Sequence, residues 1–119
     1  MIVIVAPGQG SQTPGFLEPW LDLEGAREQL GAISDAVGID LVAHGTTSDA
    51  DTIRDTKVAQ PLIVAAGLLT LSSLFADGRH EKVGGVAGHS VGEVTAAAAA
   101  GILSDTDAVA FVRERGRAM

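Results

Sequence analysis

Two short apolar runs predict the strands of this protein. Residues 1–6 form an uninterrupted run rich in β-branched side chains, which is typical of a strand buried on both faces in a parallel sheet. Residues 83–87 predict a second short strand. A turn rich in glycine follows each of them, at residues 7–12 and 88–92.

Helical patterns fill much of the chain between the strands. Apolar spacing predicts a helix over residues 24–37. The segment 61–75 is apolar almost all round, which predicts a buried helix, and Pro61 suits the first turn because a missing N–H costs nothing there. Asp77-Gly78-Arg79 is expected to end this helix. Residues 44–57 are polar and predict a loop with one short turn at most.

The last third of the chain predicts two more helices. An Ala-rich helix ends near Ala100 and is closed by Gly101. The final helix starts at Ser104, a favourable N-cap, and still runs near Met119. Strand, helix, strand, helix indicates an α/β fold with a partial parallel sheet and flanking helices. Because only two strands are evident, we expect residues 1–119 to be the first part of a larger domain.

Charge and hydropathy narrow the classes of partner. The net charge is −7, whereas nucleic acids and anionic membrane surfaces attract clustered Lys and Arg. The longest apolar stretch, residues 61–71, is far short of the roughly 20 residues of a membrane-spanning helix. The apolar run at the N-terminus lacks the basic leader of a signal peptide. We therefore expect no nucleic-acid partner, no membrane and a cytoplasmic location.

Thiol and metal chemistry are not expected. The chain contains no cysteine, which excludes disulfides, thiolate catalysis and cysteine-based metal sites. Its histidines and carboxylates form no cluster with the spacing of metal ligands. We therefore expect no metal and no bound cofactor.

The main candidate for chemistry is a serine between two glycines. Gly88-His89-Ser90-Val91-Gly92 stands between a predicted strand and a predicted helix, the arrangement of a nucleophile elbow. So sharp a turn leaves no room for side chains beside the serine, and it pushes the hydroxyl out at the positive end of the helix. The N–H of Val91 would then be free to donate to an oxyanion. A glycine-rich turn around a buried serine is the alternative.

An oxyanion hole needs a second donor near the serine. The Gly-Gln-Gly sequence of residues 8–10 lies at the carboxyl end of the first strand, the edge where α/β sheets place their sites. Glycines on both sides would let the backbone N–H of Gln9 approach a substrate oxygen. An ordinary tight turn is the alternative.

Arg115 stands out on the final helix. At about 100° per residue, the face of the helix that carries Arg115 also carries Ala108, Phe111, Val112 and Met119. An arginine on an apolar face is costly to bury unless an anion meets it. It can also reach solvent or pair with an internal carboxylate. The helical pattern by itself favours these two alternatives. A carboxylate ligand is the third interpretation, which a guanidinium fork suits because it holds a carboxylate in two parallel bonds.

The other titratable candidates rank lower. Glu93 lies in the first turn of the helix after Ser90, where a carboxylate is favoured anyway, so we interpret it as structural. His89 adjoins Ser90, but neighbouring positions in a tight elbow point in different directions, and a role as general base is not favoured. His44 and His80 sit in polar segments and are expected to be solvated.

The two glycine-rich loops together resemble the acyltransferase family of fatty acid and polyketide synthesis. The resemblance rests on Pro7-Gly8-Gln9-Gly10-Ser11-Gln12 and Gly88-His89-Ser90-Val91-Gly92-Glu93, and extends to Gln60-Pro61 and Arg115-Gly116-x-x-Met119. It implies that Ser90 is the nucleophile and that the N–H groups of Gln9 and Val91 form the oxyanion hole. It also implies that Gln60 and Met119 belong to the acyl pocket and that Arg115 pairs with a malonyl carboxylate.

The resemblance also implies a reaction and a domain. A malonyl group would pass from malonyl-CoA to the phosphopantetheine thiol of acyl carrier protein through a malonyl-serine ester. The fold would be the first part of an α/β-hydrolase-like acyltransferase core. In this family the histidine that deprotonates the serine and a ferredoxin-like subdomain lie further downstream, so residues 1–119 alone are expected to be inactive.

Three alternatives stay open. One is an acyltransferase domain of a modular polyketide synthase that uses another extender unit, although a pattern that begins at Met1 favours a free-standing enzyme. A serine esterase or thioesterase shares the elbow but does not need Arg115 on an apolar face. The third is a fragment without enzyme activity.

Overall fold

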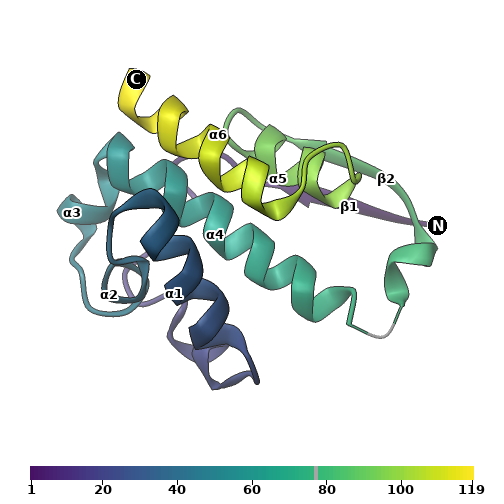
Figure 1. The fold of residues 1–119 in the computed structure, drawn as a ribbon, viewed down its shortest axis with the longest axis horizontal. Helices are drawn as coiled ribbons and strands as arrows, with labels where there is room; N and C mark the ends of the chain where they lie inside the picture. The colour runs from purple at the N-terminus through teal and green to yellow at the C-terminus, as the bar shows by residue number, and fades with distance from the viewer. Residues whose placement is uncertain (77) are drawn as a thin grey trace.

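The computed structural model describes residues 1–76 and 78–119, and Asp77, which was expected to help end a helix, lies outside them. Two strands, six α-helices and two 3₁₀ helices follow one another in these residues (Figure 1). In chain order they are β1 (Ile2–Ala6), η1 (Glu18–Asp22), α1 (Ala26–Val37), α2 (Leu41–Thr46), α3 (Ala50–Arg54), α4 (Thr56–Leu74), η2 (Arg79–Lys82), β2 (Val83–Gly88), α5 (Gly92–Ala99) and α6 (Asp105–Ala118).

The two strands are parallel neighbours although some eighty residues separate them along the chain. In the register Ile4 lies opposite Val86 and Ala6 lies opposite Gly88. The carboxyl ends of β1 and β2 therefore meet at one edge of the sheet. The turn after each strand starts from that edge, which is where α/β sheets place their binding sites. The prediction of an α/β fold with a partial parallel sheet and flanking helices is confirmed.

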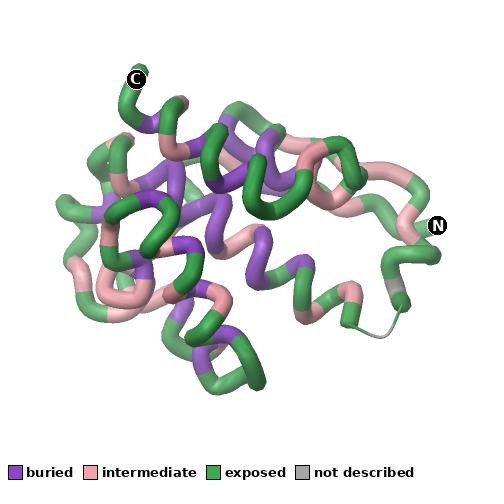
Figure 2. Tube along the Cα trace, viewed as in Figure 1, coloured by how far each residue is buried: buried purple, intermediate pink, exposed green. Residues whose placement is uncertain are grey.

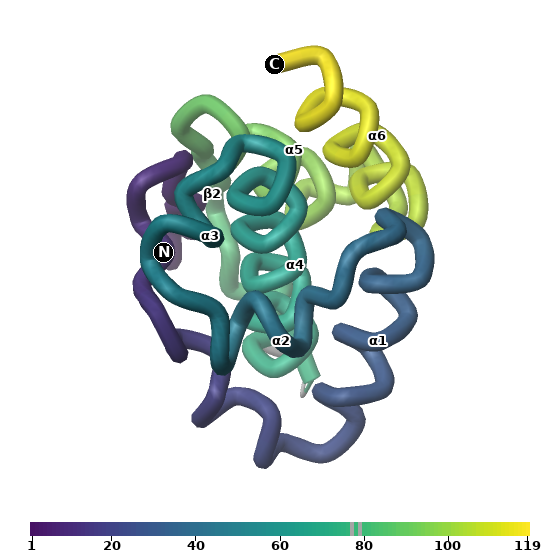
Figure 3. The backbone as a smooth tube through the Cα atoms, turned by 90° about the vertical axis from the view of Figure 1, so that its left-hand side faces the viewer, coloured from purple at the N-terminus to yellow at the C-terminus, as the bar shows by residue number. Residues whose placement is uncertain are grey.

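The helices form layers beside the sheet. Figure 3 shows the strands on one side of the molecule, α4 and α5 in the middle, and α1 and α6 on the other side. Helix α5 packs on both strands, and α4 packs against both α5 and α6. Figure 2 shows that α4 is the most continuously buried element.

Helix α4 supplies much of the core because it is apolar on nearly every side. Its buried positions are Ala59, Gln60, Pro61, Leu62, Ile63, Val64, Ala65, Leu68, Leu69 and Leu71. By length and composition alone this 19-residue helix could cross a membrane, which the shorter apolar stretch in the sequence did not indicate. Its packing against α1, α5 and α6 is that of a core helix in a globular fold.

The polar segment 44–57 is not a loop, contrary to the prediction. Helix α2 extends into it, α3 lies within it and α4 starts in it. Asp49 and Asp55 are N-caps whose side chains accept N–H groups of Thr52 and Lys57. The hydrogen bonds from the Thr52 N–H and hydroxyl to Asp49 also lower the pKa of that carboxyl. The polar residues of this segment cap the starts of helices. Hydropathy alone does not distinguish such capping residues from the polar residues of a loop.

The prediction that Pro61 lies in the first turn of its helix is wrong. The Asp55 cap starts α4 at Thr56, so Pro61 is an internal residue of the helix. A proline at that position removes one backbone hydrogen bond near the N-terminus. The helix continues because its packing on all sides outweighs that loss.

Strand β1 is not buried on both faces, which corrects another expectation. The exposed fractions of Ile2, Val3 and Val5 are 47%, 53% and 73%. Among the residues that the structure describes, β2 is the only strand that pairs with β1, and α5 is the helix that packs most on the pair. The β-branched composition predicted the strand correctly, but the covering layer on its other face is not formed by the described residues.

Candidate active site

Ser90 occupies a strained turn between β2 and α5. Its φ angle of 55° is the one positive φ at a non-glycine position among residues 1–76 and 78–119. A side chain in this left-handed region costs free energy, and such strain persists only where the surroundings enforce it. The turn directs Ser90 outward, and its side chain is exposed. The elbow that the sequence predicted is present in its geometry.

The two glycines of the elbow are required by close backbone contacts. A Cβ atom at Gly88 would overlap the backbone of Gly92 and Glu93. A Cβ atom at Gly92 would overlap the carbonyl groups of Ala6 and Pro7. Only hydrogen atoms fit at these positions, so the glycines let β1, β2 and α5 converge under the serine.

The first glycine-rich loop lies against the elbow. A Cβ atom at Gly8 would stand 2.7 Å from the carbonyl oxygen of His89, and the His89 N–H donates to the Ala6 carbonyl over 3.1 Å. On its other side the loop is tied down by Gln9, whose Nε2 donates to the Arg54 carbonyl at 3.2 Å and lies 3.3 Å from the Thr56 hydroxyl. The structure thus brings Gln9 and Ser90 to the same edge of the sheet.

Two backbone donors are available in these loops. Within the described residues neither the Gln9 N–H nor the Val91 N–H donates a hydrogen bond, whereas the next N–H groups, of Gly92 and Glu93, donate to the carbonyls of His89 and Ser90. Val91 itself is fully buried and begins the first turn of α5. Free N–H groups beside an exposed hydroxyl are what an oxyanion hole needs.

Arg115 on α6 connects the serine to a buried amide. Its Nη2 donates to Ser90 Oγ over 3.3 Å, and its Nη1 donates to Gln60 Oε1 over 2.7 Å. Gln60 Nε2 in turn donates to the sulfur of Met119 over 3.2 Å. Four of the six residues that the sequence singled out therefore form one chain of hydrogen bonds: Ser90, Arg115, Gln60 and Met119.

The apolar face predicted around Arg115 is only partly buried. The side of α6 that faces the core carries Ala108, Val109, Val112 and Gly116. Phe111 and Met119 are 55% and 67% exposed, because the buried stripe is rotated toward Val109. Arg115 itself is half-buried at the edge of this stripe.

A hollow of about 230 Å³ lies between α5 and α6 with the serine and the arginine in its wall. Its other lining residues are Glu93, Val94, Ala97, Leu103 and Phe111. The hollow is open and mostly apolar, and its polar groups are the Ser90 hydroxyl, the Arg115 guanidinium and the exposed Glu93 carboxylate. The guanidinium can attract an anionic end of a bound molecule, while the apolar wall can pack against the rest of it. The sequence indicated Ser90 and Arg115 and placed Phe111 on the face of Arg115, but it gave no signal for Leu103, which carries no motif.

The described histidines do not contact the serine hydroxyl. In the part of the chain that the structure describes, the hydrogen-bonding side chain at Ser90 Oγ is Arg115. His89 is exposed and its Nδ1 lies over Gly8, while His80 is exposed near Phe75. His44 is half-buried, and its Nδ1 lies 2.9 Å from the Ser48 hydroxyl, so it is not fully solvated as expected.

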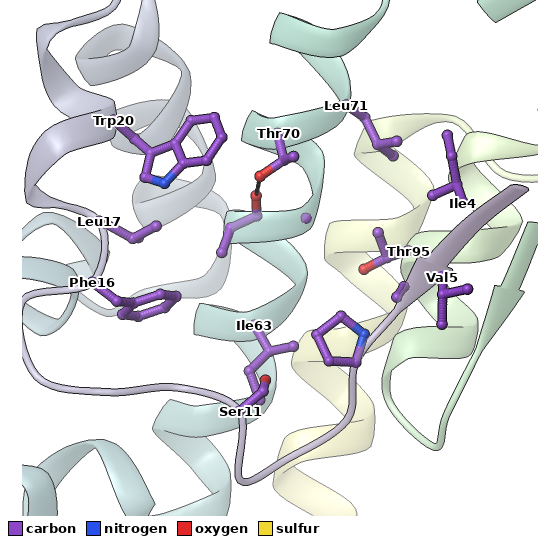
Figure 4. Close-up of a pocket in the computed structure, with 14 residues that line it drawn as sticks. Ile4, Val5, Ser11, Phe16, Leu17, Trp20, Ile63, Thr70, Leu71 and Thr95 are labelled. Atoms are coloured by element: carbon purple, nitrogen blue, oxygen red, sulfur yellow. Dashed lines mark hydrogen bonds between the residues drawn. The ribbon is translucent and has the colours of Figure 1, made fainter. Parts of the chain in front are cut away.

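A second hollow, of about 240 Å³, lies on the other side of the first loop (Figure 4). Strand β1, with Ile4 and Val5, lines it on one side and Phe16 and Trp20 line it on the other, with Ile63 of α4 between them. Its polar groups are hydroxyls such as that of Thr70, which donates to the Ala66 carbonyl. None of the described residues that line this hollow is acidic or basic.

Fold and site together define an α/β protein with a serine at a strand–turn–helix elbow, faced by an arginine. Residues 3–119 match the acyl transferase domain family, and the chain belongs to that family.

The relatives of known name agree with this class. The chain is 51% identical to the malonyl CoA-acyl carrier protein transacylase of Mycobacterium tuberculosis over its full length, and 34% identical to that of Escherichia coli K12 over 97% of its length. The crystal structure of MCAT from M. tuberculosis superposes with a TM-score of 0.94 at 51% identity. The match includes 100% of this chain and 40% of the relative, so the chain spans less than half of the relative's length.

A further solved structure contains a partner protein. A type II polyketide synthase acyl carrier protein in complex with its malonyl-transacylase matches with a TM-score of 0.84 at 28% identity. That match covers 97% of this chain and 37% of the other.

Proposed function

We propose that the protein carrying this chain transfers a malonyl group from malonyl-CoA to the phosphopantetheine thiol of acyl carrier protein. The observation that carries the proposal is the hydrogen bond from Arg115 to Ser90 at the strained elbow. It supports the proposal because a guanidinium, which is suited to bind a carboxylate, lies next to the hydroxyl that would act as nucleophile. The names of the relatives support the same reaction.

In the first step Ser90 Oγ attacks the thioester carbonyl. A bond forms between Oγ and the acyl carbon, the C–S bond breaks, and coenzyme A leaves as the thiol with the proton that the serine lost. The free N–H groups of Gln9 and Val91 stabilise the tetrahedral oxyanion. In the second step the carrier-protein thiol attacks the malonyl-serine ester, and Ser90 recovers its proton. Neither step needs a metal or a bound cofactor.

Arg115 gives the reaction its preference for malonyl. Its guanidinium stands at the wall of the hollow, where the free carboxylate of a malonyl-serine ester would arrive. A carboxylate there would replace Ser90 Oγ as the partner of Nη2. The resulting ion pair is stronger than the neutral bond it replaces.

The general base is expected from another part of the intact protein. Among the described residues no histidine contacts Ser90 Oγ, and a serine nucleophile needs a base within hydrogen-bond reach. The relatives are longer than this chain. We propose that residues 1–119 form the N-terminal part of the acyltransferase core, that the catalytic histidine and a ferredoxin-like subdomain follow, and that the protein is cytoplasmic.

The test uses the intact protein and malonyl-CoA without acyl carrier protein. Peptide mass spectrometry is expected to find a malonyl adduct on Ser90, and Ser90→Ala is expected to abolish it. Ser72→Ala, a change at an exposed serine of α4, serves as the control and is expected to keep the adduct. An adduct that persists in Ser90→Ala, or that maps to another residue, would refute the assignment.

A further inference from the structure

Gln60 is one of the two polar side chains that are buried among the described residues, the other being Thr95. It is 1% exposed and projects from the core helix α4 toward α6. A buried primary amide is costly unless its oxygen and its nitrogen are both hydrogen-bonded. The oxygen accepts from Arg115, and the nitrogen donates to the sulfur of Met119.

The orientation of the Gln60 amide follows from the chemistry of its partner. Arginine has five N–H donors and no acceptor, so only the oxygen of the amide can face it. The 2.7 Å separation between Nη1 and Oε1 is that of a short, charge-assisted hydrogen bond. Because Gln60 is packed in the core while Arg115 is half-buried, the amide fixes the guanidinium and not the reverse.

No carboxylate of the described residues neutralises the guanidinium that Gln60 holds. In residues 1–76 and 78–119 the recorded ion pairs are Arg54 with Asp51 and Arg117 with Glu114, and no carboxylate lies within 4.0 Å of Arg115. Glu93 lines the same hollow but forms no ion pair with it. The two groups that Arg115 does contact, an amide and a hydroxyl, are both neutral.

We propose that Gln60 is a positioning residue that sets acyl selectivity by holding Arg115 with a neutral acceptor. The acceptor fixes Nη1, which leaves Nη2 and the full positive charge for the carboxylate of the substrate. A glutamate at this position would hold the guanidinium equally well but would neutralise it before substrate arrives. This role differs from that of a residue that contacts the acyl group itself, and it rests on the proposed malonyl transfer.

The decisive variants are Gln60→Glu and Gln60→Met in the intact protein, assayed with malonyl-CoA and acetyl-CoA. Gln60→Glu preserves the shape and the acceptor that faces Arg115, and it loses the N–H donor to the Met119 sulfur, a loss that Gln60→Met shares. The malonyl-to-acetyl ratio of kcat/KM is expected to fall roughly 30-fold or more in Gln60→Glu, because the added carboxylate neutralises the guanidinium. Gln60→Met preserves volume and charge but removes the acceptor. The loose guanidinium is then expected to raise KM for malonyl-CoA roughly tenfold with a smaller change in kcat, as for one charge-assisted hydrogen bond.

Acetyl transfer serves as the internal control for folding, because acetyl-CoA has no carboxylate for Arg115 to bind. The matched control is Gln29→Glu, at a glutamine of α1 that bonds to Ser72 far from the elbow, and it is expected to leave both substrates unchanged. Should Gln60→Glu fail to fold, Gln60→Met carries the test alone.

Two results would overturn the inference. If both substrates decline equally in Gln60→Met, the residue only packs the core. If Gln60→Glu keeps the wild-type ratio, the neutrality of the acceptor is irrelevant. A wild-type protein that transfers no malonyl group would instead remove the proposed function and this inference with it, so the two failures are distinguishable.

Discussion

Arg115 Nη2 donates to Ser90 Oγ over 3.3 Å, although the two residues are 25 positions apart and lie on different elements. The serine stands at the elbow before α5, and the arginine lies near the end of α6. The packing of α5 against α6 brings them together. The Ser90 hydroxyl and a cation therefore share one hollow, and in the proposed function the selectivity for an anionic acyl group depends on this contact.

Removing the charge at Arg115 is expected to remove the preference for malonyl. Losing a charge-assisted pair in a partly desolvated site costs about 2–5 kcal/mol. In Arg115→Ala, kcat/KM for malonyl-CoA should therefore fall roughly 30- to several-thousand-fold, while acetyl transfer stays unchanged or improves. Arg115→Lys should restore only part of the activity, because an ammonium cannot hold both carboxylate oxygens.

The measurement is the malonyl-to-acetyl ratio of kcat/KM in the intact protein. Arg117→Ala is the matched control, since Arg117 is an exposed arginine two positions away that pairs with Glu114. Its ratio should equal that of the wild type. An equal decline of both substrates in Arg115→Ala would make Arg115 a structural residue only.

Adding one methyl group at Gly92 is expected to deform the elbow. The new Cβ would overlap the carbonyl groups of Ala6 and Pro7, so the first loop and α5 must separate. Overpacking of this kind destabilises a protein by about 1–3 kcal/mol. Gly92→Ala should lower the urea midpoint of the intact protein and abolish acylation of Ser90.

The control for this prediction is Gly31→Ala. Gly31 lies within α1 with open space where a Cβ would stand, so alanine should be neutral or should stabilise the helix by up to about 1 kcal/mol. Acylation of Ser90 should be unchanged in this variant. Wild-type acylation by Gly92→Ala would show that the elbow does not need the close contact.

Removing the N-cap of α6 is expected to loosen the helix that carries Arg115. The Ser104 side chain accepts the N–H of Asp107 over 3.1 Å. Ser104→Ala should cost about 1 kcal/mol of unfolding free energy, measured by urea denaturation, and Ser104→Thr should retain most of it. Thr106→Ala, an exposed change in the same turn, should stay within about 0.5 kcal/mol. Equal stability of Ser104→Ala and Ser104→Thr would contradict a capping role.

The sequence alone determined the local features of this protein. The β-branched run and the glycine spacing predicted β1, β2 and the elbow, because a strand and a tight turn depend on residues that are adjacent along the chain. Ser104 predicted the start of α6 for the same reason, since an N-cap and its partner are three residues apart. The motif spacing also indicated the family and the residues at which to look for the site.

The tertiary structure decided everything that depends on contacts between distant elements. The sequence pattern placed Arg115 on an apolar face, but its partners are Gln60, 55 positions away, and Ser90, and no periodicity along α6 contains them. The exposure of Val5 and Phe111 likewise depends on which layers cover the sheet and α6, and not on their hydropathy. Hydropathy records the preference of one residue for burial, whereas burial and hydrogen bonding are settled by the neighbours that the fold supplies.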